Sequence, residues 1–188
     1  MCIRDRVQIL NMDASVAWEK ETTVDSREDT TEKCIKLEFP ETLSEVYFIK
    51  LWLLEDGKIL SDNFYHASRK GINYQALKQL PEVTLDCQAK MAQDKEGNWT
   101  ATVTLTNPTS TPALMTRINV VGDKDGDQFL PILYEDNYFA LLPGEQKEVS
   151  VRWKDVDTRG NSPVIRITGY NVKAVSYTHL RAHETKAN

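Results

Sequence analysis

The chain has 188 residues, with 28 acidic and 23 basic side chains and a formal charge of −5 at pH 7. An acidic surface lacks the clustered cations that neutralise nucleic-acid phosphates or an anionic membrane, so we predict neither as a partner. No apolar run approaches the roughly 20 residues that a membrane-spanning helix needs.

Both ends of the chain look like translated laboratory DNA. The stretches MCIRDR (residues 1–6) and VSYTHL (175–180) can be back-translated into strings that are reverse complements over most of their length. Both resemble a transposase end used to prepare DNA for sequencing, and LRAHET continues into the matching adaptor. We therefore interpret residues 1–6 and 174–188 as adaptor artefacts. Removing them takes four basic and two acidic residues away, so residues 7–173 carry −7.

The tail contains two histidines, His179 and His183, with Glu184 beside them. On a helix this spacing would place both imidazoles on one face, as in a zinc site. Because the adaptor origin explains the whole segment, we predict no metal site there. Only His66 then remains, which we expect to be structural, and no nucleophilic triad can be assembled.

Residues 7–68 are expected to form a partial immunoglobulin-like sandwich. SVAWEKETTV (15–24) and EKCIKLEFP (32–40) are predicted strands. VYFIKLWLLEDGKILSDNFY predicts a hairpin that turns at Asp56-Gly57. About sixty residues are few for a complete sandwich, so we expect its first strands to be missing and the apolar faces of residues 47–54 to be exposed.

Residues 69–80 are expected to be a linker that contains a short helix. Asn73 is suited to cap a helix over residues 74–80, and Pro81 would end it.

Residues 81–173 show period-two alternation that is typical of half-buried antiparallel strands. EVTLDCQAKM and NWTATVTLTN each place small or apolar residues on one face and polar residues on the other. Further strands are expected at 114–121, 128–134, 146–153 and 164–172, separated by turn clusters. We therefore predict an all-β chain of tandem immunoglobulin-like β-sandwiches, the first of them truncated.

Several residues in these units invite functional interpretations. Cys34 and Cys87 are expected to be small buried apolar residues rather than a disulfide. Trp99 and Trp153 share faces with apolar neighbours and are expected in the core. The stretch GDKDGD has carboxylates but not the spacing of a calcium-binding EF-hand, so a hairpin turn through Asp125-Gly126 is the expected structure.

The stretch LYEDNYFALLPGE is the most unusual in the sequence, and it leaves two alternatives open. Tyr134, Asp136, Asn137 and Tyr138 are candidates for substrate binding or for an interface, because aromatic residues in a polar loop can serve both roles. In the alternative, the loop is a structural corner. Asp136 and Asn137 would then bond the backbone, while Tyr138, Phe139 and Leu141 fill the core.

Four motifs in order resemble the C-terminal part of glycoside hydrolase family 2 enzymes of the bacterial β-mannosidase and exo-β-D-glucosaminidase type. They are LSDNFY, YQALKQLP, LTNPTSTPAL and LPILYEDNYFALLPGE. The resemblance implies two immunoglobulin-like domains that follow a TIM barrel, which carries the two catalytic glutamates of a retaining glycosidase. Neither glutamate lies in the matched region, so the resemblance assigns no catalytic residue, metal or cofactor here.

The resemblance further implies a non-catalytic supporting role in a periplasmic or extracellular exo-glycosidase. The partners would be the missing barrel, through intramolecular packing, and the oligosaccharide substrate of the parent enzyme. The alternative is a surface carbohydrate-binding or adhesin sandwich without an enzyme, because sandwiches of this kind host many roles.

Overall fold

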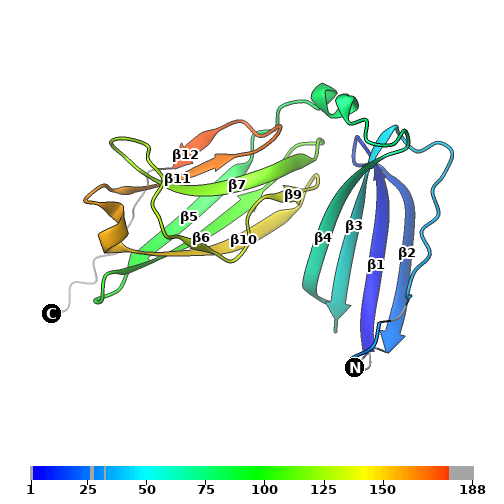
Figure 1. Cartoon of the computed structure of the whole chain (residues 1–188), viewed down its shortest axis with the longest axis horizontal. Coiled ribbons are helices and arrows are strands. Elements are labelled where there is room, and N and C mark those ends of the chain that lie inside the picture. Colours follow the sequence, from blue (N-terminus) through cyan, green and yellow to red (C-terminus); the bar gives the residue numbers. More distant parts are fainter. Residues whose placement is uncertain (1, 26–27, 32, 178–188) are drawn as a thin grey trace. The chain divides into compact units, whose positions relative to one another are not determined.

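The structure is a computed structural model that describes residues 2–25, 28–31 and 33–177. Its regular elements within these ranges are β-strands and two short 3-10 helices, which confirms the all-β prediction. The chain divides after Leu80 into two compact units, called unit 1 and unit 2 below (Figure 1). In the described part of the chain, no helix has the length and apolar character needed to cross a membrane.

Unit 1 contains one antiparallel sheet with the strand order β2-β1-β3-β4. The strands are β1 (Cys2–Asn11), β2 (Val16–Asp25), β3 (Val46–Glu55) and β4 (Lys58–Ser68). The predicted hairpin is confirmed, since Asp56 and Gly57 have φ values of 49° and 77° between the paired strands. Two consecutive left-handed residues match the right-handed twist of the flanking strands. That this sheet belongs to a larger sandwich stays a prediction.

The strand predicted over residues 32–40 is wrong, because no strand is found in the described residues of this segment. Its alternation is nevertheless visible in burial: Ile35 and Leu37 are half-buried, and they line a pocket with Val7 and Leu51. Side-chain alternation in this segment shows which of its side chains face the sheet, but it does not provide a neighbouring strand for backbone hydrogen bonds. Both edges of β1 are already paired, with β2 and with β3.

Two strands include residues that we interpret as adaptor-derived. Strand β1 begins at Cys2 and pairs with both neighbours, and β12 (Val175–Tyr177) pairs with β11. Backbone pairing is open to almost any non-proline residue, so the adaptor origin stays a prediction. His179, His183 and Glu184 lie outside the described residues.

The apolar stretch around residues 47–54 is less exposed than expected. Phe48 is fully buried, and Tyr47, Ile49 and Leu51 are half-buried. The extended segment before β3 helps to cover this stretch, since the Phe39 and Tyr47 rings meet edge to face with their centroids 5.7 Å apart.

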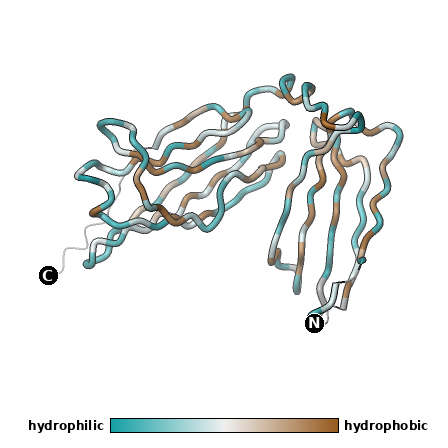
Figure 2. The backbone as a smooth tube through the Cα atoms, viewed as in Figure 1, coloured by the Kyte–Doolittle hydropathy of each residue, from teal (hydrophilic) through white to brown (hydrophobic). Residues whose placement is uncertain are grey.

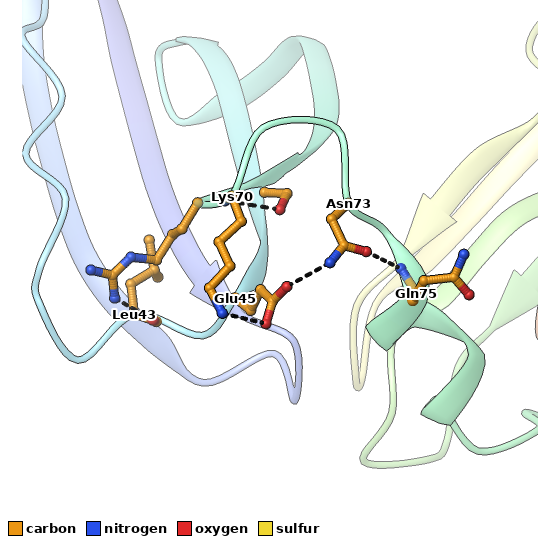
Figure 3. A network of polar contacts seen from close by, with 7 residues as sticks. Leu43, Glu45, Lys70, Asn73 and Gln75 are labelled. Carbon is orange, nitrogen blue, oxygen red and sulfur yellow. Dashed lines mark hydrogen bonds and ion pairs between the residues drawn. The ribbon is translucent and has the colours of Figure 1, made fainter.

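The predicted linker, residues 69–80, belongs to unit 1, and a polar network around Glu45 connects it to the rest of that unit (Figure 3). The Asn73 amide donates to Glu45 Oε1 at 3.0 Å, and Glu45 also pairs with Lys70 at 3.5 Å. The predicted helix is a shorter 3-10 helix, η1 (Gln75–Gln79). Asn73 Oδ1 accepts from the Gln75 amide at 3.2 Å, but the residue at the N-cap position is Tyr74.

Unit 2 is a sandwich of two four-stranded sheets, with the orders β5-β6-β10-β8 and β12-β11-β7-β9. This confirms the prediction of an immunoglobulin-like sandwich in this part of the chain, whereas the bounds 81–173 stay a prediction. The remaining strands are β5 (Asp86–Gln93), β6 (Asn98–Thr106), β7 (Ala113–Gly122), β8 (Leu133–Tyr134), β9 (Phe139–Leu141), β10 (Gln146–Lys154) and β11 (Pro163–Thr168). A second 3-10 helix, η2 (Asp155–Thr158), follows β10.

The core of unit 2 lies between its two sheets. Val103, Ile118, Val149 and Ile165 are each 0% exposed, and they come from four different strands. Figure 2 shows apolar residues recurring along the strands. The alternation read from the sequence therefore identifies the inward faces of β5, β6 and β10 correctly.

Two predicted strand bounds in unit 2 are wrong. The strand expected over 128–134 is reduced to Leu133–Tyr134, preceded by Pro131, which has no backbone N–H for a sheet ladder. The strand expected over 164–172 ends at Thr168. Strand β9 was not predicted, because three residues are too few to show a period.

The predicted turn in GDKDGD is confirmed. Gly122 N–H donates to the Asp127 carbonyl at 2.9 Å, and Gly126 adopts a φ of 72°. Asp125 Oδ1 accepts from the Asp127 amide and Asp123 Oδ1 from the Ser162 amide, both at 2.9 Å. These two carboxylates therefore stabilise the backbone of the turn by accepting hydrogen bonds from its amides and from a neighbouring loop. No group of three potential metal ligands is found in the described ranges.

The prediction for the two cysteines is half right. Both are free thiols; Cys87 is half-buried on β5, but Cys34 is exposed because its segment runs along the surface of unit 1. Burial raises the pKa of the Cys87 thiol to about 11, since desolvation disfavours the thiolate. The pKa of Cys34 is also raised, first by desolvation and then by a hydrogen bond with Asp5.

We expect iodoacetamide to label Cys34 well before Cys87 at pH 8. The thiolate is the reacting form, and a rise of the Cys87 pKa from 9.0 to about 11 lowers its thiolate fraction by about a hundredfold. Peptide mapping of a time course distinguishes the sites. Labelling of Cys87 at the rate of Cys34 would contradict its burial.

Candidate functional site

Tyr134 is the first of the four candidate residues, and it joins the two sheets of unit 2. It lies on β8 opposite Val151 of β10, and its hydroxyl accepts a long hydrogen bond of 3.4 Å from the Val120 amide on β7. Burial raises the pKa of the Tyr134 phenol. Its ring packs against the core, so this residue serves the sandwich itself.

Asn137 acts as a substitute strand partner for β7. Its Oδ1 accepts from the Ile118 amide at 2.8 Å, and its Nδ2 donates to the Ile118 carbonyl at 2.9 Å. The Asn137 side-chain amide thus makes the two hydrogen bonds that a neighbouring strand would make with Ile118, two residues before β9 begins. This contact agrees with the structural-corner alternative.

We expect Asn137→Ala to lower the free energy of unfolding of unit 2 by about 2 kcal/mol, because both backbone groups of Ile118 lose a partner. Chemical denaturation followed by tryptophan fluorescence measures the change. Asp136→Ala is the neighbouring control and should cost less than about 1 kcal/mol, because the Asp136 carboxylate is partly exposed and pairs with Lys147 at 2.6 Å. Equal losses in both variants would contradict this role for Asn137.

Tyr138 points away from the core, so the expectation that it fills the core is wrong. It is 53% exposed, with a φ of 61°, and the Arg117 guanidinium lies 5.5 Å from its ring centroid. Phe139 and Leu141 do pack against the core, as expected. An exposed aromatic residue held in the left-handed region costs backbone strain, and such strain often marks a contact surface.

The four candidates therefore separate into two groups. Tyr134 and Asn137 hold the sandwich together, whereas Asp136 and Tyr138 stay near the surface beside Lys147 and Arg117. Binding or interface function for the loop stays a prediction, and it now depends on Asp136 and Tyr138.

A cavity of about 670 Å³ lies at the end of unit 2 where β6 begins and β10 ends. Trp153 is 4% exposed, which confirms its core position, while Trp99 is half-buried and stacks on it. The cavity is lined by Asp94, Asn98, Trp99, Thr100, Pro131, Leu133, Arg152, Trp153, Lys154, Val156 and Asp157. The sequence located the two tryptophans on inward faces but did not predict this opening.

A charged cluster on the sheet of unit 1 was also missed. Lys50 is 3% exposed in the middle of β3, and its amine pairs with Asp62 on β4 at 2.8 Å. The amine and the Arg6 guanidinium both lie near the Trp52 ring, at 5.6 Å and 5.3 Å from its centroid. One lysine inside the apolar run FIKLWLL was the only sequence signal.

Comparison with known families gives a match over residues 63–172, to the model described as the exo-β-D-glucosaminidase Ig-fold domain. An exo-β-D-glucosaminidase of Streptomyces avermitilis is 29% identical over 190 residues, which cover 88% of this chain and 21% of that protein. An exo-β-D-glucosaminidase of Amycolatopsis orientalis is 30% identical over 151 residues, which cover 69% of this chain and 14% of that protein. The chain thus spans about a fifth or less of these relatives.

Solved structures share the fold. The crystal structure of Amycolatopsis orientalis exo-chitosanase CsxA aligns with a TM-score of 0.80 at 22% identity, covering 95% of this chain and 24% of that one. The family match includes the 134–139 loop and the tryptophan cavity, both of which lie in unit 2. With more than half of its residues matched in order, the chain belongs to the exo-β-D-glucosaminidase Ig-fold domain family.

Proposed function

We propose that this chain is a non-catalytic accessory region of a retaining exo-β-glycosidase that removes terminal glucosamine from oligosaccharides. The family match over residues 63–172 carries the proposal. The small share of each relative that the chain spans supports it. The alignment covers 21% of the Streptomyces relative, so 79% of that protein lies outside the aligned part. We further propose that the parent belongs to glycoside hydrolase family 2 and works in the extracellular space or the periplasm. A β-mannosidase is the alternative within the same enzyme class.

The accessory region would support the catalytic barrel by packing against it. Its partners are the barrel of its own chain and the oligosaccharide substrate of the parent enzyme. Exposed apolar side chains on unit 2 offer contacts for this packing: Met115 is 50% and Tyr138 53% exposed, and both hold a left-handed backbone. Met115 lies in a β-bulge of β7, and the Tyr138 amide donates to Asn137 Oδ1 at 3.1 Å, so both exposed side chains are held in place by the local backbone.

The natural DNA upstream of residue 7 tests the proposal. We expect a continuous reading frame that encodes a barrel with two glutamates at strand ends, and hydrolysis of a glucosamine-terminated oligosaccharide by the protein it encodes. A frame of further sandwiches without a barrel would overturn the enzyme assignment and favour the surface-binding alternative. Activity on mannosides alone would select the β-mannosidase type.

We further propose that the 134–139 loop lies at the rim of the parent's active site, and Tyr138→Ala in the intact enzyme tests this position. A rim contact predicts a KM raised by about tenfold, roughly the loss of one aromatic contact of 1.4 kcal/mol. Tyr170→Ala is the control, because Tyr170 is an equally exposed tyrosine, at 52%, that lies outside the 134–139 loop. Unchanged kinetics in Tyr138→Ala would remove the loop from the rim.

A further inference from the structure

The cavity beside Trp99 and Trp153 has the dimensions of a ligand site. Its volume of about 670 Å³ falls within the range of about 300–1,000 Å³ that is typical of pockets for small molecules. It lies where the first residues of β6 face the last residues of β10, next to η2. Both long strands belong to the sandwich, so the part of the lining that they contribute is held by strand pairing.

The aromatic wall of the cavity is held in one orientation. The Trp99 and Trp153 rings are parallel, with an interplanar angle of 5° and centroids 5.9 Å apart. The Trp99 indole N–H also donates to Asp155 at 2.8 Å, which fixes the ring about its side-chain bonds. A half-buried indole that is already ordered loses little conformational entropy when a flat apolar surface binds against it.

The cavity is lined by both apolar and polar groups. Leu133 and Val156 line the cavity although they are 64% and 78% exposed. Arg152, Lys154 and Asp157 line it too, and no hydrogen bond or ion pair of their side chains is found within the described residues. Asp94 differs, since its carboxylate accepts from the amides of Glu96 and Asn98 at 2.9 and 2.8 Å.

This arrangement matches the surface of a pyranose ring. One face of the ring presents C–H groups that pack against an indole, while the hydroxyls at its edge need charged or polar partners. An ammonium group on the ring would gain further from the Asp157 carboxylate and from the electron-rich indole face. Arg152 is then available to a ring hydroxyl.

We propose that this cavity is a binding subsite for a β-linked glucosamine oligosaccharide, with one sugar ring packed against Trp99 and its ammonium group beside Asp157. The choice of glucosamine rests on the proposed function; the pyranose-binding geometry rests on the cavity alone. Such a subsite would retain polymeric substrate close to the parent enzyme between rounds of hydrolysis.

Titration calorimetry of the 188-residue chain with the glucosamine tetramer tests the proposal. We expect binding that Trp99→Leu and Leu133→Ser each weaken by at least tenfold and Asp157→Asn by about fivefold. Leu133→Ser removes an apolar contact without adding charge, and the variant should stay folded because that side chain is 64% exposed. Leu60→Ser is its matched control: Leu60 is 50% exposed on β4 of unit 1, and the change should leave affinity unchanged. Thermal melts establish that every variant is folded.

The glucose tetramer and the N-acetylglucosamine tetramer separate the two parts of the proposal. We expect both to bind at least fivefold more weakly than the glucosamine tetramer, and Asp157→Asn to remove that difference. Equal binding of all three tetramers would overturn the assignment to sugars that carry a free ammonium group. Absence of binding, or binding that none of the cavity variants weakens, would overturn the subsite. Neither result bears on the upstream reading frame, so the proposed function would stand or fall separately.

Discussion

Asn107→Ala is expected to lower the free energy of unfolding of unit 2 by about 3 kcal/mol. Asn107 is fully buried between β6 and β7, and its side chain makes four hydrogen bonds. Nδ2 donates to the carbonyls of Thr111 and Leu141 at 2.8 and 2.9 Å. Oδ1 accepts from the amide and hydroxyl of Thr109 at 3.1 and 2.8 Å. Truncation leaves buried polar groups without partners, which costs more than the bonds themselves contribute.

Urea denaturation followed by tryptophan fluorescence measures the loss. Asn107→Asp separates hydrogen bonding from volume, because a carboxylate has nearly the same size but cannot donate to the Thr111 and Leu141 carbonyls. We expect it to cost at least as much as alanine. Asn98→Ala is the surface control, since the Asn98 amide donates to Asp94 in an exposed turn, and should cost less than about 1 kcal/mol. A mild effect of Asn107→Asp would show that its donors are not needed.

Phe48→Ala is expected to unfold unit 1 while unit 2 stays folded. Phe48 is fully buried on β3, and its ring centroid lies 5.2 Å from that of Phe64 on β4. Removing a buried phenylalanine side chain costs about 3–5 kcal/mol. A small unit built on one sheet has little stability in reserve, because short chains bury a smaller fraction of their surface.

Hydrogen exchange measured by mass spectrometry follows the two units separately. In Phe48→Ala, amides of β1–β4 should lose protection, while those of β5–β11 keep it. Phe39→Ala provides the control, because Phe39 is 51% exposed and contacts only the edge of Tyr47 among the described ring pairs. Retained protection in unit 1 would mean that its sheet is more stable than its size indicates. Loss of protection in both units would mean that they unfold together.

Strand alternation and turn chemistry were the reliable sequence signals. Asp56-Gly57 identified the hairpin because few residue pairs adopt two left-handed conformations, and Asp125-Gly126 identified a turn for a related reason. Alternation in residues 98–106 identified which side chains enter the core, and Val103 and Leu105 are fully buried there. These signals depend on residues that are close in the sequence, so they can be interpreted without knowledge of the fold.

The functional surfaces depended on contacts between distant residues. Nothing local distinguishes Asn137, which bonds Ile118, from Tyr138 beside it, which stays exposed. The Trp99 cavity likewise needs Leu133 and Asp157 to meet β6 from other parts of the chain. Sequence resemblance suggested the family, which the comparison confirmed, but it assigned no geometry to these residues.

The sequence by itself therefore determined the all-β class, the hairpin and the inward faces of β5, β6 and β10, because period and turn chemistry are local properties. Only the tertiary structure decided that residues 33–40 form no strand, that Tyr138 stays outside the core and that two tryptophans line an opening. The physical reason is that strand pairing and burial depend on which partner is available. Alternation in residues 33–40 sets which side chains face the sheet, but it does not align the backbone of this segment with either edge strand, β2 or β4.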